Sequence, residues 1–285
     1  MKVAFAGLGV MGFPMAAHLA KAGHDVAVYN RTPEKAARWV AAHGGRAGAS
    51  AAEAAAGAEV FMLCVGNDDD VRQVVAEALP AMAPGGVVVD HTTTSAVVAR
   101  EMAALAANDG RAFVDAPVSG GQAGAENGQL AIMCGGEPAA FAKIEPVIAA
   151  YAKATRLMGG PGSGQLTKMV NQICIAGVVQ GLAEGLHFAK RAGLDPQGVY
   201  EAISKGAAQS WQMDNRWKTM SEGKFDFGFA VDWMRKDLGL VLDEARRNGA
   251  ALDMTAMVDG FYAEVQALGG RRWDTSSLVA RLEKP

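Results

Sequence analysis

The chain has 285 residues, of which 50% are hydrophobic and 20% charged, and its formal net charge is −3. This balance is typical of a soluble globular protein with enough apolar material for a core. Because the chain has neither a Lys/Arg block nor an apolar run approaching roughly 18 residues, we expect no nucleic-acid partner and no membrane span.

Short β-like runs alternate with Ala-rich segments of helical periodicity in the first half of the chain. The expected strands cover residues 2–7, 25–30, 59–65, 86–91, 111–117, 129–136 and 154–160. The expected helices between them cover residues 12–22, 33–43, 69–82, 95–109 and 137–151. Strands that alternate with helices predict right-handed βαβ units and a parallel sheet. The sequence therefore predicts an α/β fold with a doubly wound, Rossmann-type domain over residues 1–162.

The segment "PGSGQLTKMV" opens a second half of a different kind. No proline interrupts residues 165–192, and a helix of about 28 residues would be about 42 Å long. Gly193 is expected to end this helix, with Asp195 capping the next one and Pro196 at its first position. Further helices are expected at 196–205, 209–221, 229–249 and 253–268. These features predict an all-α domain over residues 163–285, joined to the first domain by the long helix.

The first turn of the chain carries the spacing G-x-G-x-x-G between an expected strand and an expected helix. In that setting the first glycine permits a tight turn, the second lets a pyrophosphate approach the backbone, and the third lets helix and strand pack closely. The N–H groups and the dipole of the helix then hold the phosphates. The alternative is a set of plain turn glycines. We expect cofactor contacts from Gly7, Leu8, Gly9, Val10, Met11 and Gly12.

The end of the second strand lacks the acidic residue that normally accepts hydrogen bonds from the adenosine ribose, and reads Asn30, Arg31, Thr32 instead. An arginine beside two neutral hydrogen-bonding side chains would attract a 2′-phosphate that a carboxylate would repel. The alternative is a turn in which Asn30, Thr32 and Pro33 only start the next helix. We expect NADP(H) to be the preferred cofactor, with NAD(H) as the alternative.

Four segments of the sequence occur in an order that is typical of one family. They are "GLGVMGFPMAAHLAKAGHDVAVYNRT" (7–32), "DAPVSGGQAGAENGQLAIMCGG" (115–136), "GSGQLTKMVNQ" (162–172) and "MRKDLGLVLDEA" (234–245). Together they resemble the β-hydroxyacid dehydrogenases, which include 3-hydroxyisobutyrate dehydrogenases and the tartronate semialdehyde and glyoxylate/succinic semialdehyde reductases. The resemblance covers nearly the whole chain and is specific for the family, not for the substrate. It implies reversible, NADPH-dependent reduction of a small carboxylate-bearing aldehyde to its hydroxyacid.

Lys168 is the expected catalytic residue. Hydride transfer between a nicotinamide and a carbonyl needs an acid/base at the substrate oxygen, and burial or a nearby cation can lower a lysine pKa from about 10.4 towards about 7–8. The resemblance implies that Lys168 protonates the carbonyl oxygen during reduction, and that Asn171, on the same helical face, orients the substrate. The alternative is a solvated helix lysine. We expect the substrate to lie in the cleft between the two domains.

The resemblance implies further contacts to substrate and cofactor. "VSGG" follows the fifth strand, where ligands of doubly wound sheets bind, and Ser119, Gly120 and Gly121 are expected to hold the substrate carboxylate. Their alternative is a plain glycine turn. Lys236 is expected to reach the nicotinamide region, and its alternative is a solvated charge run over residues 235–237. The remaining expected cofactor contacts are Val65, Gly66 and Thr93.

Three departures from the family pattern line the expected pocket and limit any statement about the substrate. Gln172 stands where relatives often have a second asparagine, and the loops "CVGNDDD" and "DHTTTSA" lack prolines common in relatives.

The acidic run 68–70 is expected to cap a helix beginning near residue 70, because helix dipoles favour negative charge there and no ligand pattern accompanies it. We therefore expect no metal site.

Other side chains are expected to be structural. The three cysteines, Cys64, Cys134 and Cys174, lie in apolar runs without a CxxC pair and are expected to be buried thiols in a reducing compartment. Since "MKVAFAGLG" lacks the long apolar region of a signal peptide, we expect a cytoplasmic location. Trp211, Trp217 and Trp233 are expected to pack in the helical domain, and the alternative is that they cover the substrate cleft.

The sequence thus predicts an NADP(H)-dependent oxidoreductase with a small carboxylate-bearing substrate, and the family resemblance implies a homodimer or homotetramer. Two alternatives stay open. One is a related reductase acting on another carbonyl or on an imine, which Lys168 disfavours because imine reductases generally place a different residue there. The other is a non-catalytic NADP-binding sensor, which has no need of the acid/base Lys168 or of Asn171.

Overall fold

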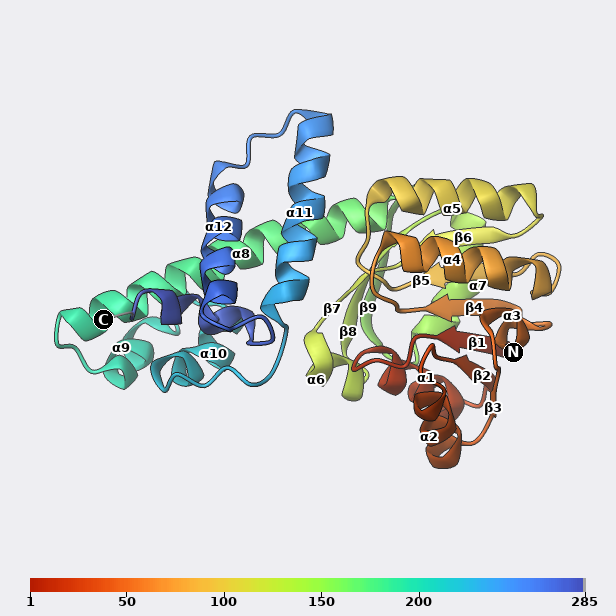
Figure 1. Cartoon of the computed structure of the whole chain (residues 1–285), viewed down its shortest axis with the longest axis horizontal. Coiled ribbons are helices and arrows are strands. Elements are labelled where there is room, and N and C mark those ends of the chain that lie inside the picture. The colour runs from red at the N-terminus through yellow and green to blue at the C-terminus, as the bar shows by residue number, and fades with distance from the viewer. Residues whose placement is uncertain (284–285) are drawn as a thin grey trace. The chain divides into compact units, whose positions relative to one another are not determined.

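The computed structural model describes residues 1–283 and divides the chain into two compact units. The first is Met1–Lys168, and the second begins at Met169. The first unit combines strands and helices, drawn in red to green, and the second unit is helical, drawn in green and blue (Figure 1). Each unit is described by itself below.

The first unit is built on a nine-stranded sheet within the described residues. Its strands are β1 (Lys2–Ala6), β2 (Asp25–Tyr29), β3 (Arg46–Ala47), β4 (Val60–Leu63), β5 (Val87–Asp90), β6 (Ala112–Asp115), β7 (Val118–Ser119), β8 (Leu130–Gly135) and β9 (Ala152–Gly159). The order is β3-β2-β1-β4-β5-β6-β8-β7, with β9 paired to β8. Strands β1 to β6 are parallel, and β1 lies between β2 and β4, where the winding of the sheet reverses. The predicted doubly wound, Rossmann-type sheet is confirmed.

Helices cover both faces of this sheet. They are α1 (Gly12–Lys21), α2 (Pro33–His43), α3 (Ala51–Ala55), α4 (Asp68–Ala78), α5 (Ala96–Asn108), α6 (Gly121–Glu126) and α7 (Pro138–Ile148), with a 3₁₀ turn at Leu79–Ala81. Successive residues of β1 point to opposite faces: Phe5 packs in a core with α1 and α7, and Ala4 in a second core with α4 and α5. A strand buried on both faces is apolar throughout, which is why the parallel strands read as continuous apolar runs.

Two features of this unit differ from the sequence-based expectation. Strand β8 runs antiparallel to β6 and to the short β7, so the far end of the sheet is mixed. Four short elements were not expected from the sequence, namely β3, α3, β7 and α6. They have two to six residues, too few for a periodic apolar pattern to be visible, and glycines interrupt the segment that forms β7 and α6.

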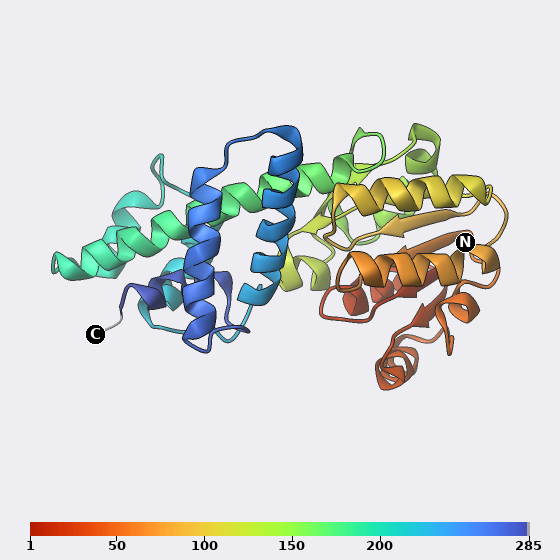
Figure 2. The same ribbon diagram turned by 45° about the horizontal axis from the view of Figure 1, so that its top comes forward.

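The second unit packs around α8 (Ser163–Arg191), whose first residues belong to the first unit. Its other helices are α9 (Pro196–Ile203), α10 (Trp211–Ser221), α11 (Val231–Asn248) and α12 (Asp253–Ala267), followed by a 3₁₀ segment at Thr275–Arg281. Asp195 caps α9 by accepting the N–H groups of Gln197 and Gly198, as predicted. Helices α11 and α12 lie side by side in both views (Figures 1 and 2). The predicted long helix and helical second half are confirmed.

The long helix is also the one described helix that is long and apolar enough to cross a membrane, with a mean hydropathy of 1.2 over its most apolar window. Inside the structure 44% of that window is buried. Core helices of soluble proteins pass the same test, so this property is weak evidence for a membrane span.

Several predicted core residues prove to be exposed. Cys134 is buried as expected, but Cys64 is only partly buried and Cys174 is exposed on α8. Trp217 is 3% exposed and packs in the helical core, whereas Trp211 and Trp233 are 56% and 42% exposed. The packing prediction is therefore wrong for these two tryptophans and for Cys174, because apolar character alone does not fix which side of a helix faces the core.

Candidate active site

The three glycines of the first turn differ in the space around them. Gly7 has a φ of +93°, and a Cβ there would overlap the carbonyl oxygen of Cys64. A Cβ at Gly12 would overlap the carbonyl oxygen of Gly7, so the start of α1 must pack closely on the turn. A Cβ at Gly9 would meet no atom of the described chain within 4 Å. The turn thus leaves open space at the second glycine, where a pyrophosphate approaches the backbone in dinucleotide-binding domains.

The start of α1 has the electrostatic character of an anion site. Its N-cap, Met11, makes no side-chain capping hydrogen bond, and its first turn carries no acidic residue. The partial positive charge of the helix N-terminus is therefore not offset by a side chain of α1. Val10 is 66% exposed in this turn, whereas Leu8 is 1% exposed and belongs to the core, so Leu8 offers a ligand only its backbone.

Asn30 holds the glycine turn in position. Its Oδ1 accepts the N–H of Leu8 (2.8 Å), and its Nδ2 donates to the carbonyl oxygen of Thr32 (3.0 Å). Thr32 is the N-cap of α2, without a side-chain capping bond, and Pro33 takes the first helical position. The amide of Asn30 is thus engaged within the protein, which favours its reading as a turn residue.

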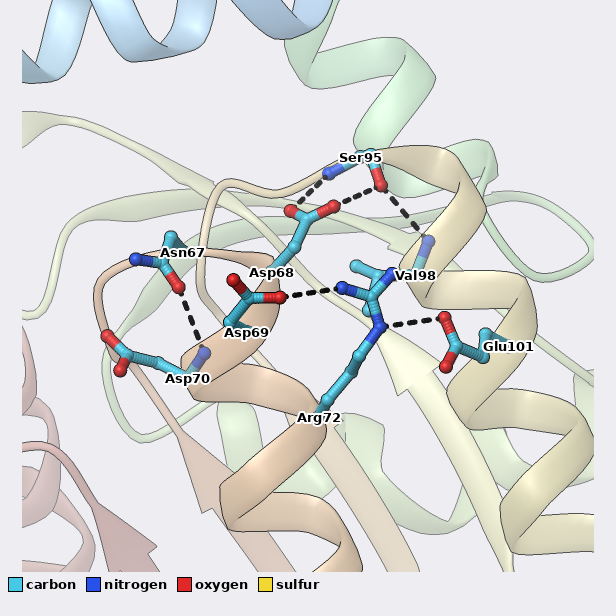
Figure 3. Close-up of polar contacts among 8 residues, drawn as sticks. All are labelled: Asn67, Asp68, Asp69, Asp70, Arg72, Ser95, Val98 and Glu101. Carbon is cyan, nitrogen blue, oxygen red and sulfur yellow. Dashed lines mark hydrogen bonds and ion pairs between the residues drawn. The ribbon is translucent and has the colours of Figure 1, made fainter.

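The side chains of the three aspartates after β4 point in different directions (Figure 3). Asp68 accepts the N–H and the hydroxyl of Ser95, Asp69 pairs with Arg72 (3.0 Å), and Asp70 accepts the N–H of Gly66 (3.2 Å). The helix begins at Asp68, earlier than expected, and its N-cap is Asn67, which accepts the N–H of Asp70 (2.9 Å). The aspartates are therefore first-turn residues and not caps. Within residues 1–283, no group of three His, Cys, Asp or Glu side chains could hold a metal ion.

Arg31, the residue expected to favour NADP(H), lies beside one of these aspartates. Its Nη1 is 3.4 Å from Oδ1 of Asp70, and 86% of its side chain is exposed. The guanidinium therefore lies at the end of β2 with room for a further anionic partner, but next to a carboxylate that the sequence-based reasoning did not connect with it.

The loop after β5 is tied to the start of α8 by one side chain. Gln165 is buried, its Nε2 donates to the carbonyl oxygen of Thr92 (2.7 Å), and its Oε1 accepts the N–H of Thr94 (3.0 Å). Thr92 Oγ1 in turn accepts the N–H of Val65 (3.0 Å) from the loop after β4. Between two buried threonines, Thr93 is only partly buried. These bonds join Val65 and Thr93, both expected cofactor contacts, to α8.

Asp115, at the end of β6, caps α8 from outside the helix. Its Oδ1 accepts the N–H of Gly162 (2.7 Å) and its Oδ2 that of Gln165 (2.8 Å). Gly164 has no room for a Cβ, which would overlap the carbonyl oxygen of Met133. Burial raises the pKa of the Asp115 carboxyl from 3.8 to about 6, although the backbone N–H groups partly oppose this shift. The start of α8 is thus fixed at the carboxyl end of β6.

Lys168 follows Gln165 by about one helical turn and is 8% exposed. It is therefore not the solvated helix lysine of the alternative reading. The chain from Asp115 through Gln165 fixes the backbone one turn before Lys168, at the strand ends where ligands of doubly wound sheets bind.

The "VSGG" segment forms the short strand β7 and leads into α6, instead of a plain turn. Ser119 lies in β7 opposite Ala131 of β8 and is partly exposed. Gly120 and Gly121 are exposed and have φ values of +135° and +62°, which L side chains rarely adopt. The backbone conformation therefore favours glycine at both positions, and Ser119 directly precedes them in the chain.

In the second unit, Asn171 and Lys236 are linked through two buried polar residues, Gln172 and Asp237. Asn171 Nδ2 donates to Gln172 Oε1 (2.8 Å), and Gln172 Nε2 donates to Asp237 Oδ2 (2.7 Å). Lys236 Nζ lies 3.2 Å from Asp237 Oδ1, and its ammonium is 6.0 Å from the ring centre of Trp233. Gln172, the departure from the family pattern, thus links Asn171 to a carboxylate that is only 2% exposed.

The segment 235–237 is therefore not a solvated charge run. Arg235 makes a bidentate pair with Asp259, at 3.0 Å for each bond, and Lys236 pairs with the buried Asp237. Sequence reasoning missed Asp237 as a partner. The signal in the sequence was the acid directly after Lys236 within an expected helix.

The chain is similar to known oxidoreductases over its full length. Residues 2–160 match the family model described as the NAD binding domain of 6-phosphogluconate dehydrogenase. Residues 162–282 match the model described as NAD-binding of NADP-dependent 3-hydroxyisobutyrate dehydrogenase.

Two curated relatives and one solved structure illustrate the similarity. An "uncharacterized oxidoreductase" of Shewanella frigidimarina is 65% identical over 99% of this chain and 98% of its own length. The "probable 3-hydroxyisobutyrate dehydrogenase-like 1, mitochondrial" of Arabidopsis thaliana is 39% identical over 99% of this chain and 85% of its own. The structure of Mycobacterium tuberculosis 3-hydroxyisobutyrate dehydrogenase with L-serine has a TM-score of 0.91, 33% identity and 99% coverage of both chains.

Proposed function

Because this chain belongs to the β-hydroxyacid dehydrogenase family of NAD(P)-dependent oxidoreductases, we propose that it reversibly reduces a small carboxylate-bearing aldehyde to its hydroxyacid with NADP(H). The observation that carries this proposal is the buried Lys168 one turn beyond Gln165, which is itself bound at the ends of β5 and β6. A buried lysine held at this edge of a doubly wound sheet suits proton transfer beside a bound dinucleotide.

Lys168 acts as the general acid in the reducing direction. When bound, the nicotinamide supplies the hydride to the carbonyl carbon. The ammonium of Lys168 gives its proton to the carbonyl oxygen as the hydroxyl forms, and water restores that proton. In the oxidising direction the neutral amine accepts the hydroxyl proton. The open space at Gly9 and the uncapped start of α1 fit the pyrophosphate of the cofactor.

The substrate carboxylate is held by the N–H groups of Gly120 and Gly121 and by the hydroxyl of Ser119. Asn171 orients the substrate, and Lys236 adds positive charge near the reacting groups. A substrate of about two to four carbons fits the family. The M. tuberculosis relative was solved with L-serine, which is itself a β-hydroxy acid, and this supports a short chain with a carboxylate.

The preference for NADP(H) over NAD(H) is assigned to Arg31. Its exposed guanidinium at the end of β2 can make paired hydrogen bonds to a 2′-phosphate, and no acid occupies position 30. The description of the second matching family model as NADP-dependent supports this assignment.

The chain is further proposed to form a cytoplasmic homodimer or homotetramer, with no nucleic-acid or membrane partner. Helix α8 exposes an apolar face at Val170 (59%), Val178 (38%) and Phe188 (70%), with the exposed Cys174 between them. Apolar residues that recur on one exposed helical face are typical of a helix–helix interface, and the molar mass in solution tests this.

Cofactor absorbance during turnover tests the enzymatic proposal. NADPH oxidation is measured with glyoxylate, succinic semialdehyde, tartronate semialdehyde and methylmalonate semialdehyde, and then with NADH. We expect at least one aldehyde to be reduced, and Lys168→Ala to lower kcat by about 10²–10⁴-fold while the affinity for NADP⁺ is kept.

The alternatives predict different outcomes of the same assay. A non-catalytic sensor would turn over none of these aldehydes, nor the hydroxyacids in reverse, in either form of the protein. A relative acting on imines would reduce an imine but none of the aldehydes, and Lys168→Ala would then matter less.

A further inference from the structure

A carboxylate from another element lies beside Arg31, near the end of β2, where the sequence itself supplies no acid. Dinucleotide-binding domains hold the adenosine ribose with an acid at the end of the second strand, where this chain has Asn30. Asp70 comes from the first turn of α4, after β4, and its Oδ1 lies 3.4 Å from Nη1 of Arg31. Strands β2, β1 and β4 are neighbouring and parallel, so the residues after them meet at one edge of the sheet.

The structure holds Asp70 more firmly than it holds Arg31. The second oxygen of Asp70 accepts the N–H of Gly66 (3.2 Å), and its own N–H donates to Asn67 (2.9 Å). A Cβ at Gly66 would lie 2.5 Å from Asp70 Oδ2, so a larger residue there would displace the carboxylate. The side chain of Asp70 is 25% exposed and that of Arg31 86%. The carboxylate is the fixed member of the pair, and the guanidinium is the movable one.

We propose that Asp70 is a specificity-determining residue that limits the preference for NADP(H) over NAD(H) by pairing with Arg31. This inference rests on the proposed function. A 2′-phosphate that binds Arg31 must share the guanidinium with Asp70 and lies close to a like charge, whereas the ribose hydroxyls of NAD(H) can donate to the same carboxylate. Arg31 and Asp70 therefore oppose each other, and the chain accepts both cofactors with a moderate preference for NADP(H).

Asp69 offers a matched control because it is the next residue and belongs to the same helical turn. Its side chain is 93% exposed and pairs with Arg72, whereas the side chain of Asp70 points away from Arg72 (Figure 3). Asp69→Asn and Asp70→Asn change the net charge and the helix dipole environment equally. Only the charge lost at Asp70 faces Arg31. Asp70 is also the less exposed of the two and accepts the N–H of Gly66, which the side-chain oxygen of an asparagine can still accept.

Nucleotide binding, measured by calorimetry without turnover, tests the inference. The probes are NADP⁺, NAD⁺ and the fragments 2′,5′-ADP and 5′-ADP. For Asp70→Asn we expect Kd for NADP⁺ and 2′,5′-ADP to fall about three- to tenfold, and Kd for NAD⁺ to stay the same or to rise. For Asp69→Asn we expect both Kd values within about twofold of the parent protein, as for an exposed charge.

Other outcomes separate this inference from the cofactor proposal. Equal effects of Asp69→Asn and Asp70→Asn would overturn the role of Asp70, because only general charge would then matter. If Asp70→Asn has no effect while Arg31→Gln weakens NADP⁺ binding, Asp70 is not a determinant but the NADP(H) proposal stands. If neither Arg31→Gln nor Asp70→Asn changes the ratio of the NADP⁺ and NAD⁺ affinities, both proposals fail.

Discussion

The turn from β1 into α1 and the turn from β9 into α8 both combine glycines with the start of a helix, but their N-termini differ in charge and space. At α1 no side chain caps the helix, no acid lies in its first turn, and Gly9 faces open space. At α8 the buried carboxylate of Asp115 accepts the N–H groups of Gly162 and Gln165. No carboxylate of the described chain is seen to cap the start of α1, whereas the carboxylate of Asp115 caps the start of α8.

Because of this difference, the start of α1 can bind an anionic ligand, whereas the start of α8 serves to hold the helix in position. A helix N-terminus attracts phosphate only while its N–H groups are available. Where the protein's own carboxylate satisfies them, the same geometry fixes the helix against the sheet, and at α8 it thereby fixes the residues that lead to Lys168. Both turns look alike in sequence as glycine-rich turns before helices, and only the position of Asp115 in space distinguishes them.

Glycine substitutions in the first turn sharpen the comparison and have the largest expected effect. Gly12→Ala places a Cβ against the carbonyl oxygen of Gly7, so the backbone must shift, at a cost of about 3 kcal/mol or more. Gly9→Ala meets nothing in the described chain, so we expect an unchanged melting temperature but NADP⁺ binding weakened by about tenfold or more. Thermal unfolding and calorimetry measure the two effects. If Gly9→Ala lowered the melting temperature but left the affinity for NADP⁺ unchanged, the space at Gly9 would not be the place where the cofactor binds.

Asp115→Asn removes the carboxylate that caps α8, and we expect its effect on the free energy of unfolding to depend on pH. Burial raises the pKa of Asp115 from 3.8 to about 6, so the folded protein favours the neutral carboxyl. The free energy of unfolding then has a contribution that is present below pH 3.8 and is lost as pH rises to about 6. At about 1.4 kcal/mol per pKa unit, this loss amounts to about 3 kcal/mol.

The difference in unfolding free energy between the parent protein and Asp115→Asn measures this contribution. Asparagine also loses one acceptor for the two N–H groups, so the variant is less stable in general. We expect its disadvantage to shrink between pH 3.5 and pH 7, because the parent protein alone loses the burial contribution. A disadvantage that grows with pH would mean that the N–H groups of Gly162 and Gln165 outweigh burial at this carboxyl.

Much of this architecture follows from local rules in the sequence. The continuous apolar strands, the glycine turn at Gly7–Gly12, and the cap and proline at Asp195 and Pro196 each depend on neighbours in sequence, and they were predicted correctly. The long helix that carries Lys168 was also predicted, but its first residues, up to and including Lys168, belong to the first unit and not to the second. The catalytic role of Lys168 stays a prediction.

The partners of the site residues could not be predicted because they come from distant parts of the chain. Asp70 lies 39 residues from Arg31, Asp237 lies 65 residues from Gln172, and Gln165 lies 71 residues from Thr94. The periodic pattern of apolar residues carries no information on pairs so far apart in the chain. Within the acidic run 68–70, the sequence does not indicate which carboxylate faces which partner. The exposure of Trp211, Trp233 and Cys174 depends in the same way on tertiary packing.

The last prediction concerns Gln165, and it tests whether the start of α8 that Asp115 caps positions Lys168 or only stabilises the fold. Gln165→Met keeps the volume but removes the bonds to the Thr92 carbonyl and the Thr94 N–H. We expect kcat to fall about ten- to a hundredfold with an unchanged Kd for NADP⁺, because the backbone before Lys168 is no longer tied to the loop after β5.

Gln165→Glu separates positioning from stability. The glutamate can still accept the N–H of Thr94, but it can donate to the Thr92 carbonyl only when its carboxyl is protonated. Its kcat relative to the parent protein should therefore rise as pH falls through the carboxyl pKa, whereas kcat of Gln165→Met should stay low at every pH. Both variants could instead lose activity only in proportion to a lowered melting temperature, with no such pH dependence. Gln165 would then have a structural role alone, and the start of α8 that Asp115 caps would not position Lys168.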